Sequence, residues 1–236
     1  MSNHYFQFKQ FRINQERCAM KVTTDACLLG AWPVLADTAI RVLDIGTGTG
    51  LVALMLAQRY PNIQIDGIEL NPEAAEQAVE NVVNSPWFNR INIIRQDIRD
   101  FTHLQLYDIV ITNPPFFRNS LLGPDMARNA ARHTDGLDDR TLLEAAERCL
   151  TQHGTIAVLL PLKEFRLFEK LFNGQGWWCN RSLLVRNNAD KPDKRVIAIM
   201  SRQQSAAVIE KLTIRDDQNE YTTSFKELLS PFYLHL

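Results

Sequence analysis

A glycine-rich stretch, DIGTGTG at 44–50, has the residue types and spacing of a ligand-binding loop. Because glycine has no Cβ, Gly46, Gly48 and Gly50 can adopt positive φ and let the backbone approach a ligand closely. Dinucleotide enzymes usually have G-x-G-x-x-G, which rests a pyrophosphate on a helix N-terminus. Here the spacing is G-x-G-x-G with an acid, Asp44, two residues before it. The loop therefore disfavours a nicotinamide oxidoreductase and predicts a different cofactor.

A second stretch, ITNPPF at 111–116, places two hydrogen-bond acceptors beside an aromatic ring. Consecutive prolines cannot continue a central strand, because each lacks the N–H that the ladder needs. The side-chain oxygen of Asn113 and the carbonyl of Pro114 can each accept an N–H, in directions that the prolines set in advance. An amine on an aromatic base is a poor nucleophile, and two acceptors can turn its lone pair toward the group that it attacks. Phe116 is expected to stack on the base.

The elements around these stretches predict an α/β fold, a Rossmann-like, doubly wound and mostly parallel sheet of seven strands. Strands are expected at 40–45, 63–70, 91–97, 107–112 and 154–161, and helices at 51–59, from Pro72 onward, at 138–152 and at 163–173. Asn71 is a good N-cap for the helix that begins at Pro72. Since ligands bind at the carboxyl ends of such strands, Glu69 and Asp97 are expected beside the glycine loop.

The last third of the chain predicts a hairpin, a strand and a helix. The hairpin joins 178–186 to 194–200, the strand covers 211–215 and the helix 222–234. We expect one domain over 1–236, with an N-terminal arm (1–32), a Rossmann-like core (33–200) and a C-terminal extension (201–236).

Composition and charge exclude several classes of protein. The 236 residues include 45% hydrophobic and 22% charged residues, without a signal-peptide core or the ~20 apolar residues that span a bilayer. A cytoplasmic location is therefore expected, without a membrane partner. The four cysteines form no CxxC pair, which predicts reduced thiols and no metal site. A net charge of −1 argues against a coat of nucleic acid but allows a local basic footprint.

The glycine loop with its downstream acids resembles the cofactor site of class I S-adenosylmethionine-dependent methyltransferases. In that family the acid that ends the second strand accepts the ribose hydroxyls, and the third-strand acid contacts the adenine amine. The resemblance implies S-adenosylmethionine as cofactor, with S-adenosylhomocysteine as product. It implies binding by Asp44, Gly46, Gly48, Gly50, Glu69, Leu70, Asp97, Ile98 and Asn113. Asp100, three residues after Asp97, is an alternative to it.

The NPPF stretch resembles the N/D-P-P-Y/F/W motif of amino-methyltransferases, which implies catalytic roles for Asn113, Pro114 and Phe116. Enzymes that methylate adenine N6, guanine N2 and the side-chain amide of glutamine share this motif. A guanine-N2 methyltransferase acting on ribosomal RNA and a protein glutamine methyltransferase therefore remain alternatives. So does a non-enzymatic, cofactor-dependent RNA-binding module, although Asn113 argues against it. DNA is not expected as a partner, because the chain has no room for a target-recognition domain.

Segments at 6–32, 85–93, 131–137 and 221–234 resemble the bacterial tRNA (adenine-N6)-methyltransferases that modify adenine 37 of a valine tRNA. The resemblance implies a tRNA anticodon stem-loop as partner, with no obligate protein partner. It also implies that KVTTD, 21–25, closes the cofactor pocket, which adds Lys21, Thr23 and Asp25 to the site. The family commonly has tyrosines after NPP, so only the stacking role is carried over to Phe116. Candidates for RNA contacts are Lys9, Arg12, Arg17, Arg118, Arg132, His133 and Lys194.

Overall fold

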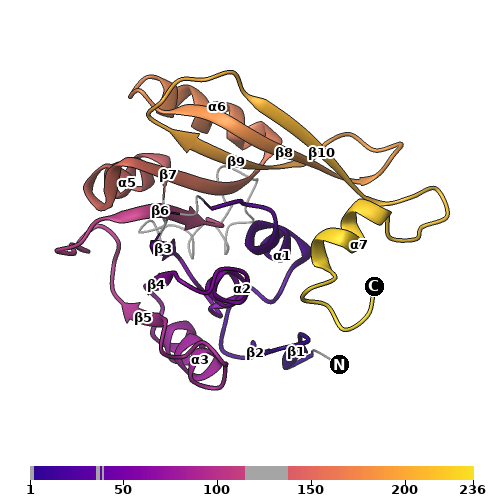
Figure 1. The fold of residues 1–236 in the computed structure, drawn as a ribbon, viewed down its shortest axis with the longest axis horizontal. Helices are drawn as coiled ribbons and strands as arrows, with labels where there is room; N and C mark the ends of the chain where they lie inside the picture. The colour runs from indigo at the N-terminus through magenta and orange to yellow at the C-terminus, as the bar shows by residue number, and fades with distance from the viewer. Residues whose placement is uncertain (1–2, 36–37, 39, 115–137) are drawn as a thin grey trace, which may run out of the picture.

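A central eight-stranded sheet dominates the computed structural model, which describes residues 3–35, 38, 40–114 and 138–236 (Figure 1). Its order is β10 (Val208–Arg215), β8 (Trp178–Asn188), β9 (Arg195–Ser201), β7 (Leu150–Pro161), β6 (Tyr107–Thr112), β3 (Arg41–Ile45), β4 (Gln64–Glu69) and β5 (Ile91–Arg95). Only β9 runs antiparallel to its neighbours among these described strands. The mostly parallel sheet is confirmed, but seven strands is wrong, because β10 adds to the edge alongside β8.

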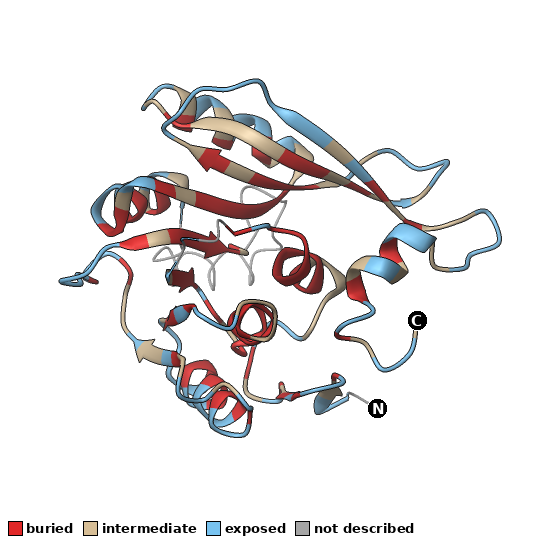
Figure 2. Cartoon of the chain, in the orientation of Figure 1, coloured by how far each residue is buried: buried red, intermediate tan, exposed pale blue. Residues whose placement is uncertain are grey.

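Helices cover both faces of the sheet (Figure 1). One face packs against α1 (Thr24–Ala31), α2 (Leu51–Arg59) and α7 (Thr223–Leu229), with α3 (Pro72–Val83) at its margin, and the other against α5 (Asp139–Cys149) and α6 (Leu162–Asn173). Val42 and Leu43 are consecutive on β3 and are buried on opposite faces, as expected for a strand covered on both sides. Figure 2 shows the resulting buried layer along β3, β6 and β7.

The predicted start of α3 is confirmed. The side chain of Asn71 accepts a hydrogen bond from the backbone N–H of Ala74 at 3.0 Å, and Pro72 occupies the first turn. The predicted hairpin is confirmed too, since β8 and β9 pair antiparallel. All four cysteines are free thiols. None of the helices in the described ranges has the length and apolar character needed to cross a membrane.

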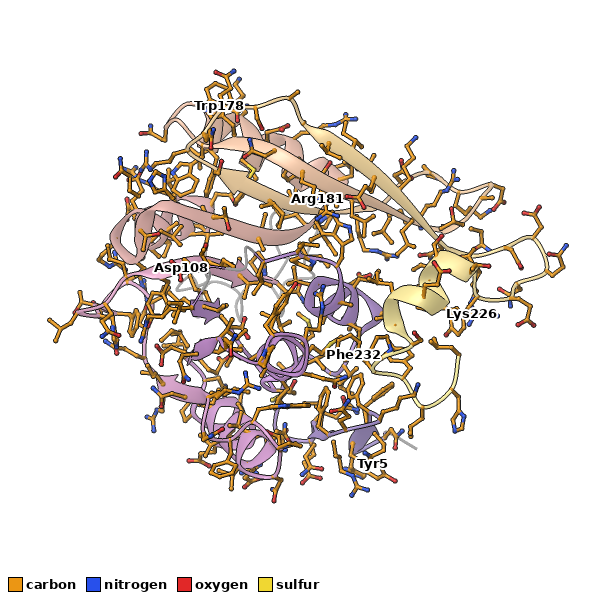
Figure 3. All side chains as sticks on the ribbon, viewed as in Figure 1. Tyr5, Asp108, Trp178, Arg181, Lys226 and Phe232 are labelled. Carbon is orange, nitrogen blue, oxygen red and sulfur yellow. The ribbon has the colours of Figure 1, made fainter. Side chains whose placement is uncertain are left out.

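The N-terminal arm begins with a short hairpin of β1 (Tyr5–Gln7) and β2 (Arg12–Asn14) that packs against the end of the chain. Phe8 forms a backbone bridge with Tyr233, and the ring of Phe11 lies 4.5 Å from that of Phe8 and 5.7 Å from that of Trp87. Figure 3 labels Tyr5 in the arm and Phe232 in the C-terminal segment. The segment at 6–32 therefore contacts both 85–93 and 221–234.

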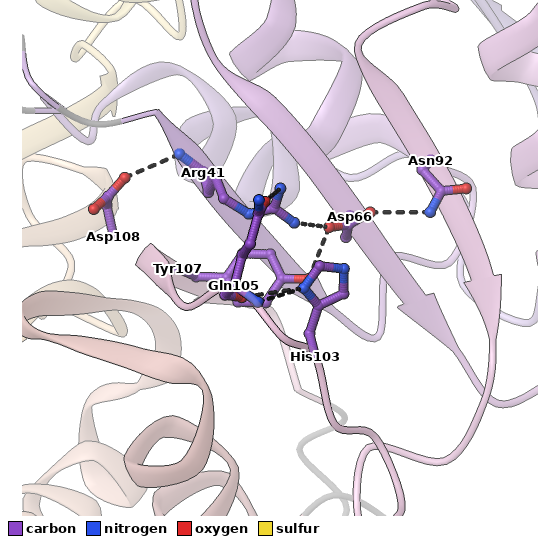
Figure 4. A network of polar contacts seen from close by, with 7 residues as sticks. All are labelled: Arg41, Asp66, Asn92, His103, Gln105, Tyr107 and Asp108. Atoms are coloured by element: carbon purple, nitrogen blue, oxygen red, sulfur yellow. Dashed lines mark hydrogen bonds and ion pairs between the residues drawn. The ribbon is translucent and has the colours of Figure 1, made fainter.

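A polar network joins the strands at the amino end of the sheet (Figure 4). Asp66, which is 8% exposed, accepts hydrogen bonds from Arg41 at 2.8 Å, from the hydroxyl of Tyr107 at 2.7 Å and from Asn92 at 3.0 Å. The carboxylate of Asp108 accepts the backbone N–H groups of residues 40 and 41 at 2.7 and 3.0 Å. These contacts hold β3, β4, β5 and β6 in register at their amino ends, opposite the end of the sheet that carries the glycine loop.

Candidate active site

A cavity of about 330 Å³ opens at the carboxyl ends of β3, β4, β5 and β6. In a doubly wound sheet this is the edge where ligands bind, next to the point at which the strand order reverses between β3 and β6. The cavity is large enough for a small-molecule cofactor. Predicted residues that line it are Lys21, Asp44, Gly46, Gly48, Glu69, Leu70, Asp97, Ile98, Asn113 and Pro114.

The glycine loop forms the floor of this cavity. Gly46, Gly48 and Gly50 have φ of 71°, 55° and 80°, in the left-handed region that other residues adopt with strain. Apart from its chain neighbours, none of the described residues has an atom within 4 Å of a Cβ placed on Gly48, so the loop leaves space for a ligand there. Gly50 does not line the cavity. It is the N-cap of α2, and its positive φ turns the chain into that helix.

Glu69 ties the glycine loop to the end of β4. Its Oε2 accepts the backbone N–H of Gly48 at 2.9 Å, and its Oε1 accepts the N–H of Asn71, also at 2.9 Å. An ionised carboxylate has about four acceptor positions, so both oxygens can accept further hydrogen bonds from a ligand. The side chain is therefore held in one orientation while it faces the cavity.

Asp44 is buried beneath the loop, with 2% of its surface exposed. Burial raises its pKa to about 7, because a charged carboxylate is poorly solvated there, and the nearby charge of Glu69 acts in the same direction. The hydroxyl of Thr47 donates to Oδ2 at 2.6 Å and opposes this rise. Asp44 thus supports the loop from below.

Asp97 lies beyond the end of β5 at the opposite wall. Its carboxylate accepts the Nε–H of Arg99 at 3.0 Å, and this hydrogen bond lowers the pKa of Asp97. Asp97 and Ile98 line the cavity and Asp100 does not. Of the two acids that the sequence left open for the cofactor adenine, the geometry favours Asp97.

Asn113 follows directly on β6 and has an unfilled acceptor. Its Oδ1 is buried and accepts no hydrogen bond from any described residue, whereas its Nδ2 makes a weak contact with the sulfur of Met20 at 3.9 Å. Buried polar atoms in proteins are almost always hydrogen-bonded, so this oxygen is an acceptor without its partner. Pro114 is buried next to it, and Phe116 lies outside the described residues.

The arm supplies one wall of the cavity through Cys18, Ala19, Met20 and Lys21. Two buried amides on α3 hold this part of the arm in place. Asn81 donates to the carbonyls of Asn14 and Thr49, each at 2.9 Å, and Gln77 accepts the N–H of Arg17 at 2.9 Å. Sequence reasoning missed both amides. Their signal is the occurrence of polar residues four apart among the alanines of one helix face.

Two further features of the arm differ from expectation. Thr23 and Asp25 do not line the cofactor cavity: Thr23 caps α1 through the N–H of Ala26 at 3.1 Å, and Asp25 pairs with Arg195 at 2.9 Å. Cys18 does line the cavity, and burial raises its pKa to about 11. The thiol is therefore protonated at neutral pH and is a poor nucleophile.

The predicted RNA-contacting residues do not form one cluster among the described residues. Lys9 donates to the carbonyl of Ser230, Arg12 lies over the ring of Tyr5, and Arg17 pairs with glutamates of α3. These three belong to the arm, whereas Lys194 precedes β9, and Figure 1 shows β1 and β9 at opposite ends of the view. Three further candidates, Arg118, Arg132 and His133, lie outside the described residues.

Solved structures share this fold. A protein from Agrobacterium tumefaciens, described as a predicted O-methyltransferase, superposes with a TM-score of 0.70 over 88% of this chain and 96% of its own, at 17% identity. A methyltransferase dependent on S-adenosylmethionine from Thiobacillus denitrificans, solved with S-adenosyl-L-homocysteine, has a TM-score of 0.50 at 17% identity, covering 72% of this chain and 70% of its own. The chain therefore has the class I methyltransferase fold.

Sequence comparison narrows the family. Residues 26–173 match the family model of the methyltransferase small domain. The tRNA1(Val) (adenine(37)-N6)-methyltransferase of Tolumonas auensis is 45% identical over 100% of this chain and 99% of its own length. The enzyme of the same name from Yersinia pseudotuberculosis is 46% identical over 98% and 92%. With relatives this similar along their full length, the chain belongs to the family of tRNA1(Val) (adenine(37)-N6)-methyltransferases, which depend on S-adenosylmethionine.

Proposed function

We propose that this protein transfers a methyl group from S-adenosylmethionine to the N6 amine of adenine 37 in a valine tRNA. The relatives named for this reaction match nearly all of the chain. The observation that carries the chemistry is the buried Oδ1 of Asn113 in the wall of the cofactor cavity, which accepts no hydrogen bond from the part of the chain that the structure describes. It is an acceptor in the place where an amine must be held.

The residues around the cavity fit the cofactor. Glu69 has acceptor positions left for two ribose hydroxyls, Asp97 and Ile98 stand where the adenine is expected, and Gly48 leaves space for the close approach of a ligand. Lys21 and its neighbours in the arm cover the cavity and help to exclude water. When bound, the cofactor supplies a methyl group on a positively charged sulfur.

The chain's own residues would orient the target amine. Oδ1 of Asn113 and the carbonyl oxygen of Pro114 each accept one N–H, which directs the nitrogen lone pair away from the adenine ring system and toward the cavity. Because Asn113 follows β6 directly and Pro114 is buried, these acceptors need little reorganisation, which is the condition for acting in a transition state. Phe116 is proposed to stack on the flipped base. The proton of the methylated amine is lost to solvent.

The location proposed for this reaction is the cytoplasm, because the substrate is a tRNA. The partner is its anticodon stem-loop, in which the bases of the loop are accessible without opening a duplex. Guanine N2 and glutamine amides remain the chemical alternatives that share the NPP-aromatic motif, and the experiment below separates them.

The test compares nucleosides from valine tRNA of cells with and without the gene, by mass spectrometry. We expect N6-methyladenosine at position 37 to disappear with the gene and to return when purified protein acts on the unmodified tRNA. A transcript with guanine at position 37 is the matched control and should gain no methyl group. Loss of a methylated guanine in ribosomal RNA, with the tRNA unchanged, would contradict the proposal.

Asn113→Ala tests the acceptor role. Loss of one preorganised hydrogen-bonding group typically lowers kcat by about 100-fold or more. The dissociation constant of S-adenosylhomocysteine should stay near that of the wild type, because the oxygen removed serves the substrate amine. Turnover near the wild-type rate would refute the role of Asn113.

A further inference from the structure

A second cavity, of about 410 Å³, lies at the same edge of the sheet, outside the cofactor site. It is formed by the N-terminus of α1, the carboxyl ends of β8 and β10, and the amino end of β9. Its lining is mostly polar, with Ile214 as the one aliphatic residue among the described residues that line it. The residues used below are Asp25, Asn187, Asn188, Arg195, Arg215 and Tyr221.

Strand register relates this second cavity to the catalytic loop. Thr112, which precedes Asn113, pairs with Val158 on β7, and three residues further along β7 Pro161 pairs with Arg195 on β9. From strand spacings, Arg195 thus lies about 10 Å further along the strands and about 10 Å across the sheet from Thr112. A few nucleotides of single-stranded RNA span such a separation. An RNA loop with its target base at Asn113 can therefore reach the second cavity.

Two arginines line the second cavity, Arg195 and Arg215. Arg195 donates to Oδ1 of Asn187 at 2.6 Å and forms an ion pair with Asp25 at 2.9 Å, although its Nε–H does not point along that line. Arg215 lies over the ring of Tyr221, 4.2 Å from its centroid, and donates one Nη to a backbone carbonyl. An arginine has five N–H donors, so each keeps donors for a ligand. Two cations and one carboxylate give the lining a net positive charge.

The packing of Tyr221 decides which part of a nucleotide fits. Phe225 stacks on the tyrosine ring at 4.7 Å between centroids, and Arg215 also lies over this ring, so the tyrosine is already engaged and offers little stacking surface to a base. What remains are guanidinium and amide donors, which suit a phosphate, and the carboxylate of Asp25, which can accept a hydrogen bond from a ribose 2′-hydroxyl. The cavity therefore fits backbone and not a base.

We propose that the second cavity binds the sugar–phosphate backbone of the tRNA a few nucleotides from the target adenine, with Arg195 and Arg215 on phosphate and Asp25 on a 2′-hydroxyl. This inference rests on the proposed function, because it takes the RNA to be bound at Asn113. It gives Asp25 a ligand that differs from the cofactor expected from the sequence. Lys194 is exposed and adjoins Arg195 in sequence, with Asp193 on its other side.

The test measures binding of an anticodon stem-loop RNA to the protein saturated with S-adenosylhomocysteine, at several salt concentrations. Arg215→Gln should weaken binding by about tenfold, and losing one phosphate contact should reduce the slope of log affinity against log salt by about 1. Asn188→Ala is a second variant that should weaken RNA binding. It should fold normally, since no hydrogen bond of its side chain is observed among the described residues. Affinity for S-adenosylhomocysteine should not change in either.

Arg202→Gln is the matched control. Arg202 also lies over an aromatic ring, 4.8 Å from the centroid of Trp177, and pairs with Glu147 at 2.8 Å. It follows the carboxyl end of the antiparallel β9 and so lies at the opposite edge of the sheet. This variant should keep the RNA affinity and salt slope of the wild type. If Arg215→Gln and Asn188→Ala also keep them, the second cavity is not an RNA site.

A further experiment replaces the loop riboses of the RNA one at a time by deoxyribose. One replacement should weaken binding to the wild type and have little effect on Asp25→Ala, because the carboxylate that receives the hydroxyl is then missing. Equal losses in both proteins at every position would overturn the role of Asp25. Methylation of the same stem-loop is measured in parallel. Normal binding with no methyl transfer would contradict the proposed function and leave the second cavity supported.

Discussion

Asp44→Asn should change how the stability of the protein depends on pH. In the folded protein, burial holds the pKa of Asp44 at about 7, against an ordinary value of 3.8. Between these values the folded state keeps a proton that the unfolded chain has lost, so the free energy of unfolding falls as pH rises. With about 1.4 kcal/mol for each pH unit, the loss between pH 4 and pH 8 is at most about 4 kcal/mol. Asparagine cannot ionise, so the variant should not show it.

The assay is denaturant unfolding of wild type and variant without cofactor, from pH 4 to pH 8. The stability of Asp44→Asn relative to wild type should rise steadily across this range and level off above pH 8. Other groups with shifted pKa, such as Asp25, titrate in both proteins and cancel in the difference. The amide oxygen can still accept the hydrogen bond that the hydroxyl of Thr47 donates. A difference that stays constant with pH would refute the assignment of the raised pKa to Asp44.

Three further predictions test other parts of the site and fold. Glu69→Ala should weaken binding of S-adenosylhomocysteine by about tenfold or more in calorimetry, since charged hydrogen bonds are worth about 1.5–3 kcal/mol each; Glu73→Ala, on the first turn of α3, is the control, and equal affinities would remove Glu69 from the site. Gly48→Ala places a side chain at φ 55°, which should lower the free energy of unfolding by about 1–2 kcal/mol and weaken cofactor binding. Unchanged cofactor binding would show that the loop does not approach the ligand. Asp66→Ala leaves Arg41 without its buried partner and should destabilise the protein by about 3 kcal/mol in denaturant unfolding. Cofactor affinity should not change, because the network lies at the amino ends of the strands and the cofactor cavity at their carboxyl ends. A loss of affinity would show that the two ends of the sheet are coupled.

The core elements could be predicted because local signals and burial agree. The strand expected at 107–112 is β6, Tyr107–Thr112, and the helix expected at 51–59 is α2, Leu51–Arg59. Both are apolar runs bounded by glycine or proline, and both are buried on most sides. The same agreement extends to the cavity, since parallel strands bring their carboxyl ends to one edge and with them Glu69, Asp97 and Asn113.

The remaining features depend on contacts between distant segments. The predicted sheet of seven strands lacks β10, because this strand pairs with β8 and not with a neighbour in sequence. Thr23 and Asp25 line the second cavity and not the cofactor cavity, because α1 begins at Thr24 and its first residues face β8, β9 and β10. Asn81 escaped notice because a buried amide is recognised only when its partners are known, and these lie 32 and 67 residues away.

The contact between the two ends of the chain sets an order for folding during synthesis. Phe8 bridges to Tyr233, and the backbone N–H of Lys9 donates to the carbonyl of Phe232 at 2.8 Å. These contacts cannot form before residue 233 has left the ribosome. The glycine loop and α3 are made much earlier, and the amides of α3 can bind the arm at Asn14 and Arg17 before the hairpin of β1 and β2 meets its partner. A growing chain can thus wall its cofactor cavity before the two ends of the protein come together.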